Sequence, residues 1–201
     1  MHFTNLLIPA LAAVFAGSAS AQATPDGFAP AVNTTLDVYY GTTYISPGLL
    51  VKKSSVSKLP AIGLTGKNLT GKYLLAMIDI DAPSNNGGPR GTVLHALLTD
   101  FTPSGATQNG TALLTTKATG PASYFGPAPP AETPKHPHNY VFLLHEQPAN
   151  FAVPQAHKQT VQSRFGIDWV KFIVDAKLTE PVAGNYLRVQ SGDNTRRWVE
   201  W

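Results

Sequence analysis

The sequence predicts a mainly β, single-domain protein built around a central sheet. Three apolar runs, residues 74–78, 93–98 and 140–144, lack polar–apolar alternation, which is typical of strands buried on both faces. Helical periodicity is scarce. The 201 residues include 17 Gly and 17 Pro but only 13% charged residues, a composition that excludes a coiled coil, a long helical bundle and a charged disordered tail. This length corresponds to one domain.

The first residues have the layout of a secretory signal peptide. Residues 6–15 are apolar, and small residues follow as far as Ala21. We expect removal of residues 1–21, with cleavage after Ala23 as the alternative, and one domain over residues 24–201. The apolar stretch is shorter than the roughly 20 residues of a membrane span, so no transmembrane anchor is expected. The predicted location is extracellular, with the vacuole or cell wall as alternatives.

Two further features agree with passage through a secretory pathway. Asn33, Asn68 and Asn109 each begin an Asn-x-Ser/Thr sequon and are predicted glycosylation sites. The chain has no cysteine, which excludes disulfides, thiol catalysis and thiolate metal sites, so the fold must depend on burial alone.

The charged residues predict no nucleic-acid partner. Fifteen basic and twelve acidic residues are scattered along the chain, giving a formal charge of +3 without a basic patch. A mildly basic surface still favours anionic ligands.

The remaining elements follow in chain order. Clusters of β-branched and aromatic residues between turn formers predict strands at 36–40, 73–80, 93–99, 140–144 and 186–190. A helix is expected after Asp168 as N-cap, because Trp169, Phe172, Ile173 and Ala176 recur at helical spacing. A second, more polar helix is expected over 154–164. Residues 120–137 contain six prolines and predict a long irregular loop of the kind that is often functional.

Polar side chains lie at the edges of the three apolar strands. Asp79 and Asp81 end the first, His95 lies inside the second, and His138 and Tyr140 open the third. Residues two apart on a strand share a face, so two histidines, a tyrosine and a carboxylate can converge. Taken singly, each also fits a structural role as a core imidazole, a turn carboxylate or a packed aromatic ring.

Three chemistries can be built from this set. A metal site would use His136, His138, His95 and Asp79, but Pro137 and the unsupported spacing disfavour it, and we expect no metal or cofactor. Nucleophilic hydrolysis lacks a Gly-x-Ser-x-Gly elbow, and Ser84 and Ser123 have only their proximity in the sequence to recommend them. Anion binding fits best, because imidazole, phenol and backbone N–H donors can surround a phosphate while a carboxylate fixes the imidazole tautomer.

The same residues carry a resemblance to a known family. Asp-Ile-Asp-Ala-Pro-Ser at 79–84, His95, Gly-Pro-Ala-Pro-Pro at 126–130 and the run from His138 to residue 147 resemble the signature segments of the phosphatidylethanolamine-binding proteins. Residues 165–167 and 181–186 resemble the C-terminal part of that family, and the likeness extends from about residue 36 to 189.

The resemblance implies a fold and a pocket. The fold is a large central β-sheet packed on a smaller sheet with a few peripheral helices. The pocket binds phosphate-type groups, including phospholipid head groups, without metal or catalytic turnover, and some members inhibit kinase pathways or serine proteases. Its expected ligand-binding residues here are Asp79, Asp81, His95, Gly126, Pro127, His138 and Tyr140.

This sequence also departs from the family pattern. Ile80, Val93 and Leu94 replace the usual proline, tryptophan and histidine. Glu132, Lys135 and His136 add charge to the loop before His138.

The expected function is that of a secreted, non-enzymatic binding protein that holds a small anion or a phosphoethanolamine-like head group. His95 and His138 would donate to the anion, Tyr140 would add a hydroxyl, and Gly126 and Pro127 would close the pocket. Asp79 would orient an imidazole or meet an ammonium group. The alternatives are an inhibitor whose partner is a serine protease such as a carboxypeptidase, and a hydrolase that uses His95 or His138 as general base.

Overall fold

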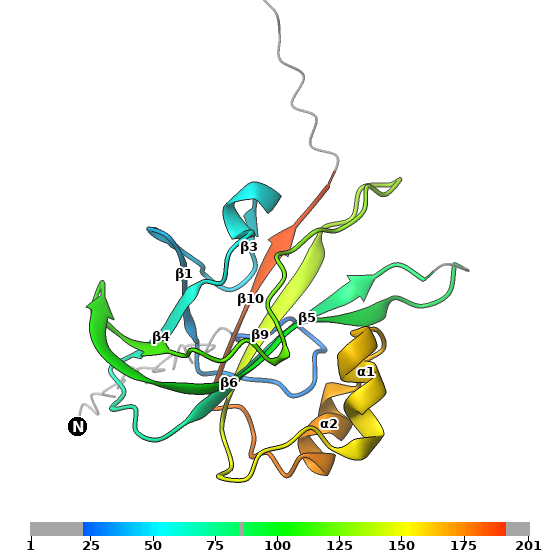
Figure 1. Cartoon of the computed structure of the whole chain (residues 1–201). Coiled ribbons are helices and arrows are strands. Elements are labelled where there is room, and N and C mark those ends of the chain that lie inside the picture. The colour runs from blue at the N-terminus through cyan, green and yellow to red at the C-terminus, as the bar shows by residue number, and fades with distance from the viewer. Residues whose placement is uncertain (1–21, 85–86, 192–201) are drawn as a thin grey trace, which may run out of the picture.

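The computed structural model describes residues 22–84 and 87–191 (Figure 1), so the predicted signal peptide, 1–21, lies outside the described residues. Within these ranges the chain forms ten strands, two α-helices and two short 3-10 helices. The strands are β1 (Asp37–Tyr40), β2 (Thr43–Tyr44), β3 (Leu49–Val51), β4 (Ala61–Thr65), β5 (Tyr73–Ala82), β6 (Gly91–Gln108), β7 (Thr111–Thr115), β8 (Pro121–Ala122), β9 (His138–Glu146) and β10 (Ala183–Val189). The helices are η1 (Lys53–Val56), η2 (Gln155–His157), α1 (Lys158–Ser163) and α2 (Trp169–Asp175).

One long strand joins a larger and a smaller sheet. The strand order is β2-β1-β4-β7-β6-β5-β9-β10-β3, and β8 pairs with β6 outside this path. The first part of β6 pairs with β5, and its last part pairs with β7 after a register shift between Pro103 and Thr107. The mainly β prediction is therefore confirmed, with the two sheets forming one continuous, curled ladder.

Two hydrophobic cores explain the apolar runs without alternation. On one face of the large sheet, Leu75 and Met77 pack with Val38 and Ile62 of the smaller sheet. On the other face, Leu74, Ile78 and Leu143 pack against Trp169 and Phe172 of α2. Figure 1 shows α1 and α2 on one side of the large sheet and β1 and β4 on the other. Each fully buried leucine, isoleucine or phenylalanine contributes about 2 kcal/mol, so strands apolar on both faces take the central positions.

The predicted elements are present, with some boundaries displaced. The strand expected at 93–99 runs on to Gln108, where Asn109 and Gly110 form a two-residue hairpin with positive φ angles of 49° and 83°. The N-cap of α2 is as predicted, because Asp168 accepts a hydrogen bond from the Lys171 N–H at 3.0 Å. The helix expected over 154–164 is a 3-10 turn followed by the shorter α1.

No helix among the residues that the structure describes is long and apolar enough to cross a membrane.

Candidate functional site

Strand pairing brings the predicted site residues to one end of the large sheet. In the antiparallel pair of β5 and β9, Asp79 lies opposite Tyr140. On β6, Ala96 pairs with Met77 and Leu94 pairs with Ile78, so His95 is the extra residue of a β-bulge. A bulge redirects a side chain out of the regular alternation. His95 therefore meets the ring of Tyr140.

The three rings form a buried cluster. The ring of His95 lies edge-on to Tyr140 with centroids 5.0 Å apart, and His138 lies nearly parallel to Tyr140 at 6.3 Å. The exposed fractions are 3% for His95, 1% for His138 and 0% for Tyr140. The structure thus places residues 45 positions apart in the chain around one point of the sheet.

His138 lies between two carboxylates. Its Nδ1 is 2.8 Å from Asp79 Oδ2, and its Nε2 is 2.7 Å from Glu132 Oε1. An ionised carboxylate only accepts hydrogen bonds, so both ring nitrogens donate and the ring is an imidazolium. Burial alone would lower the pKa of His138, but the hydrogen bonds and charges of Asp79 and Glu132 outweigh burial and raise it.

Glu132 also binds a second cation. Arg90 Nη2 lies 2.6 Å from Glu132 Oε2, and Arg90 Nη1 lies 3.2 Å from Oε1. Arg90 further donates to the backbone carbonyl of Asp81. Hydrogen bonds from Arg90 and then from His138 lower the pKa of Glu132 to about 2. A carboxylate therefore already occupies the position facing His138, on the side away from Asp79.

The two aspartates have different partners. Asp79 Oδ1 accepts the Asp81 N–H at 2.8 Å, so both of its oxygens are engaged and it orients His138. Asp81 accepts from the backbone N–H and the side-chain amide of Asn139 at 2.8 and 2.7 Å, and His136 Nε2 lies 3.3 Å away. Asp81 thus fixes the start of β9 and makes no contact with His138.

His95 is oriented by a contact with the backbone of Phe125. Its Nδ1 lies 2.9 Å from the Phe125 carbonyl oxygen, which can only accept, so this nitrogen carries the proton. Burial lowers the pKa of His95, and in the resulting neutral ring Nε2 bears a lone pair. His95 therefore donates to an anion at Nε2 only after it gains a second proton. Phe125 covers the ring in a stacked contact with centroids 3.8 Å apart.

The backbone of the Gly-Pro loop packs closely against the end of η1. A Cβ atom on Gly126 would lie 2.7 Å from the Val56 carbonyl oxygen and 2.8 Å from Ser57 Cα, so only glycine allows this approach. Pro127 is buried beside it. Both residues follow Phe125, whose ring stacks on His95.

Arg164, the residue that follows α1, contacts the same loop. Its Nη1 donates to the Ser123 carbonyl at 2.8 Å, and its guanidinium lies 5.0 Å from the Phe125 ring centroid. Arg164 has no local sequence signal, because its partner lies 41 residues away.

Tyr140 carries an unpaired hydroxyl. Its Oη is buried and lies near the Asp79 carboxylate and the Ala128 backbone, but among the described residues no contact to it has hydrogen-bond geometry. Burial first, and then the charge of Asp79, raise the pKa of Tyr140, so the phenol keeps its proton. A buried hydroxyl without a partner is rare and marks a place that an additional acceptor can complete.

The rival chemistries find less support in the geometry. Across the described ranges, 22–84 and 87–191, no group of three or more His, Asp or Glu side chains is arranged to hold a metal. Within the same ranges, neither Ser84 nor Ser123 hydrogen-bonds a histidine, and Ser123 Oγ instead accepts from Arg164 at 3.1 Å.

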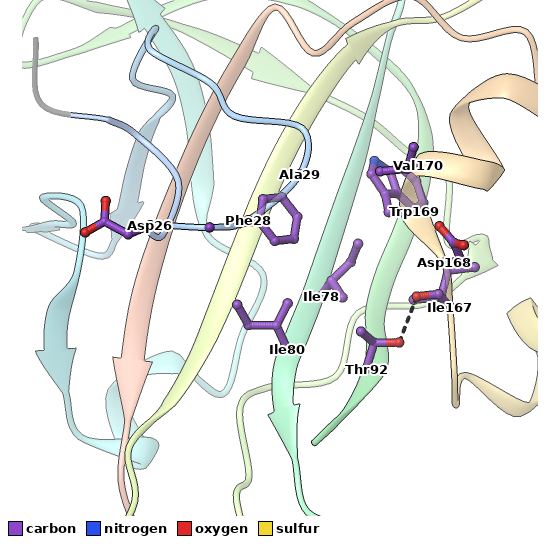
Figure 2. Close-up of a pocket in the computed structure, with 11 residues that line it drawn as sticks. Asp26, Phe28, Ala29, Ile78, Ile80, Thr92, Ile167, Asp168, Trp169 and Val170 are labelled. Carbon is purple, nitrogen blue, oxygen red and sulfur yellow. Dashed lines mark hydrogen bonds between the residues drawn. The ribbon is translucent and has the colours of Figure 1, made fainter. Parts of the chain in front are cut away.

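A separate cavity of about 350 Å³ lies on the opposite face of β5. Figure 2 shows Ile78 and Ile80 facing this space, with Phe28 across from them and Trp169 at the start of α2. Neighbouring residues on a strand point to opposite faces, so this mostly apolar cavity is distinct from the site at Asp79.

Comparison with known proteins identifies the family. The sequence profile described as phosphatidylethanolamine-binding protein matches residues 16–187. The chain belongs to the phosphatidylethanolamine-binding protein family. The recognition made from the sequence is therefore confirmed, and the matched range begins 20 residues before the expected 36–189.

Relatives of this phosphatidylethanolamine-binding protein differ widely in name. Phomoidride biosynthesis cluster protein N of Talaromyces stipitatus is 29% identical over 198 residues, covering 90% of this chain and 96% of that protein. The 26 kDa secreted antigen of Toxocara canis is 32% identical over 122 residues, covering 60% of this chain but 42% of the antigen.

The fold also matches a solved structure. Carboxypeptidase Y inhibitor, solved in complex with its cognate proteinase, has a TM-score of 0.59 at 21% identity, over 79% of this chain and 84% of the inhibitor. At this identity the match supports the fold alone.

Proposed function

We propose that this protein is a non-enzymatic binding protein that holds a phosphate-type anion in the cluster around His138. The observation that carries the proposal is the contact between the buried His138 imidazolium and the carboxylate of Glu132. That contact supports anion binding because it puts negatively charged oxygens opposite His138. The unpaired Tyr140 hydroxyl next to this ring offers one more donor.

Each side chain then has a specific role. His138 Nε2–H and Tyr140 O–H donate to the anion, and Asp79 holds the imidazolium in place. His95, Phe125, Gly126 and Pro127 form the wall of the pocket. Each Asp79 oxygen already accepts one hydrogen bond, from His138 and from the Asp81 N–H, so Asp79 acts on the ligand through His138.

The protonation states favour binding over catalysis. His138 donates from both nitrogens and has no lone pair with which to act as a general base. His95 has a lone pair at Nε2, but no serine hydroxyl hydrogen-bonds it within the described ranges. The biosynthetic name of the Talaromyces relative is the reason to include an assay of ester turnover.

We further propose that the protein is secreted and glycosylated, with cleavage after Ala21. Ala23 and Thr24 are buried, and the Ala23 N–H donates to the Val32 carbonyl at 2.8 Å, so cleavage after Ala23 would remove part of the folded domain. Asn33, Asn68 and Asn109 are all exposed, which suits attached sugars. The Toxocara relative carries the name of a secreted antigen.

Titration calorimetry with inorganic phosphate and phosphoethanolamine tests the binding proposal. We expect the wild type to bind and His138→Gln to bind at least about tenfold more weakly, through loss of a charged donor. His157→Gln is the matched control, because His157 is also buried and lies 2.7 Å from a carboxylate, that of Asp175, outside this cluster. Absence of binding by the wild type, or equal loss in both variants, would overturn the proposal.

Inhibition of a serine carboxypeptidase and hydrolysis of a simple ester, assayed in parallel, separate the two alternatives. We expect neither activity. Inhibition that persists in His138→Gln would favour the protease inhibitor, and turnover lost in that variant would favour the hydrolase.

A further inference from the structure

Glu132 occupies the position that a bound anion is expected to take. Its two oxygens are shared between His138 and Arg90, at 2.7, 2.6 and 3.2 Å. Its side chain is 17% exposed and that of Arg90 is 32% exposed, so this contact lies at the solvent side of the cluster. Beneath it, His138 is 1% exposed. A ligand from solution therefore meets Glu132 and Arg90 before it reaches His138.

The loop that carries Glu132 is exposed on both sides of this residue. Residues 130, 131 and 133–135 are exposed, and 127–137 contain no helix or strand. Pro129 is buried, and its carbonyl accepts from Ser191 Oγ at 2.5 Å, which fixes the loop upstream. Rotation of the Glu132 side chain, or movement of the exposed part of the loop, can thus separate the carboxylate from His138 without disturbing a core strand.

The directions of the donors are not all met while Glu132 is in place. Glu132 accepts from His138 and Arg90, with Oε1 serving both, but the buried Tyr140 hydroxyl next to His138 makes no hydrogen bond among the described residues. A carboxylate is planar and its oxygens point in two directions, whereas the three terminal oxygens of a phosphate monoester point in three. A phosphodiester has only two charged terminal oxygens and offers fewer strong acceptors to the same donors.

The charge of the ligand also favours a phosphate monoester over a diester. With Glu132 displaced, His138 and Arg90 face the ligand as two cations, with Asp79 behind the imidazolium and Asp81 held by Asn139 and His136. A singly charged diester only replaces the charge that Glu132 supplied. A phosphate monoester carries about −1.5 to −2 at neutral pH and gains additional attraction.

We propose that the Glu132 carboxylate occupies the position of the ligand in the free protein. An incoming phosphate monoester displaces this carboxylate and binds both His138 and Arg90. This inference rests on the proposed function and makes it narrower. Glu132 sets the selectivity of the pocket, and Arg90 becomes a ligand-binding residue. Intact phosphatidylethanolamine, a diester, is a poor ligand, whereas phosphoethanolamine or a phosphatidic acid head group is a good one.

Calorimetry at pH 7 with phosphoethanolamine and glycerophosphoethanolamine tests this selectivity. We expect the wild type to bind the monoester about tenfold more tightly than the diester, and Glu132→Gln to bind the monoester about tenfold more tightly than the wild type. In the Glu132→Gln background, Arg90→Gln lowers the affinity again. Vesicles containing phosphatidic acid, compared with soluble phosphoethanolamine, distinguish a lipid-borne monoester from a free one.

Glu180→Gln is the charge-matched control, because Glu180 is exposed and follows Thr179, which contacts His145 near the other end of β9. We expect its affinities to equal those of the wild type. Glu132→Asp, with a side chain too short to keep both contacts, is the second variant and should change affinity in the same direction as Glu132→Gln.

The outcomes separate the two proposals. Equal monoester affinity in the wild type and both Glu132 variants, or a wild type that prefers the diester, would overturn the role of Glu132 while leaving phosphate binding intact. Absence of phosphate binding in every variant would overturn the proposed function itself, and this inference with it.

Discussion

Glu132 Oε1 lies 2.7 Å from His138 Nε2, and this contact joins a proline-rich loop to the first residue of β9. Because Asp79 binds the other ring nitrogen, the ring is held as an imidazolium between two carboxylates. The protonation state of His138 therefore links the loop to the ring cluster.

The stability that His138 contributes should decrease as the pH rises. Its folded-state pKa is raised above 6.5, so the contribution is complete below that value and is lost as the pH rises through the folded-state pKa. The facing groups are Asp79 from β5, Glu132 with Arg90 behind it, and His136, whose ring centroid is 6.0 Å away.

Urea denaturation of the wild type and of His138→Gln between pH 5.5 and 9 measures this effect. The variant leaves Asp79 buried without its partner, so we expect it to be less stable by about 3 kcal/mol at low pH, with the difference narrowing as the pH rises. The comparison between variants is needed because His95 and His145 have lowered pKa values, which act with the opposite sign. A difference that is independent of pH would contradict the imidazolium assignment.

Tyr140→Phe should separate binding from stability. The hydroxyl has no partner in the described structure, so we expect the free energy of unfolding to stay within about 1 kcal/mol of the wild type, while phosphate affinity falls. Tyr40→Phe is the matched control. It loses a 2.8 Å hydrogen bond to Tyr124 and should cost about 1 kcal/mol without affecting phosphate binding. Equal destabilisation by both variants would show that Tyr140 has a structural partner.

Gly126→Ala should disturb the wall of the pocket. The added Cβ meets the backbone of Val56 and Ser57, so we expect a loss of about 1 to 3 kcal/mol and a changed NMR environment for His95 through Phe125. Gly91→Ala is the control, because the nearest atom to its added Cβ is 4.0 Å away. Thermal denaturation and histidine NMR spectra check both, and a neutral Gly126→Ala would show that the loop is free to move.

The mature N-terminus should be Gln22. Expression in a eukaryotic secretory host, followed by mass spectrometry of the secreted protein, checks this. A start at Thr24 would mean that the Ala23 N–H contact with Val32 is dispensable. Glycosidase treatment of the same sample reports whether Asn33, Asn68 and Asn109 carry sugars.

The sequence is most informative where burial alone decides the structure. The runs at 74–78 and 140–144 predict central strands because cores lie on both faces of the sheet. β4 and β7 are harder to find, since each has five residues and β4 contains Gly63, whose backbone packs closely on Ala112.

The site is predictable only in part, for a geometric reason. The two-residue period of strands and the order of the apolar runs bring Asp79, His138 and Tyr140 together. The direction of His95 depends on a bulge. Arg90 and Glu132 are 42 residues apart, and their pairing depends on the path of the loop before β9. Neither feature has a local sequence signal.

The most direct measurement is a crystal structure of the wild type grown at pH 6 to 7 with phosphoethanolamine. We expect its phosphate oxygens within hydrogen-bonding distance of His138 Nε2, Arg90 and Tyr140 Oη, and the Glu132 carboxylate turned away from the imidazole. A structure in which Glu132 keeps its contact with His138 at saturating ligand, with the Tyr140 hydroxyl still unpaired, would contradict phosphate binding at this site.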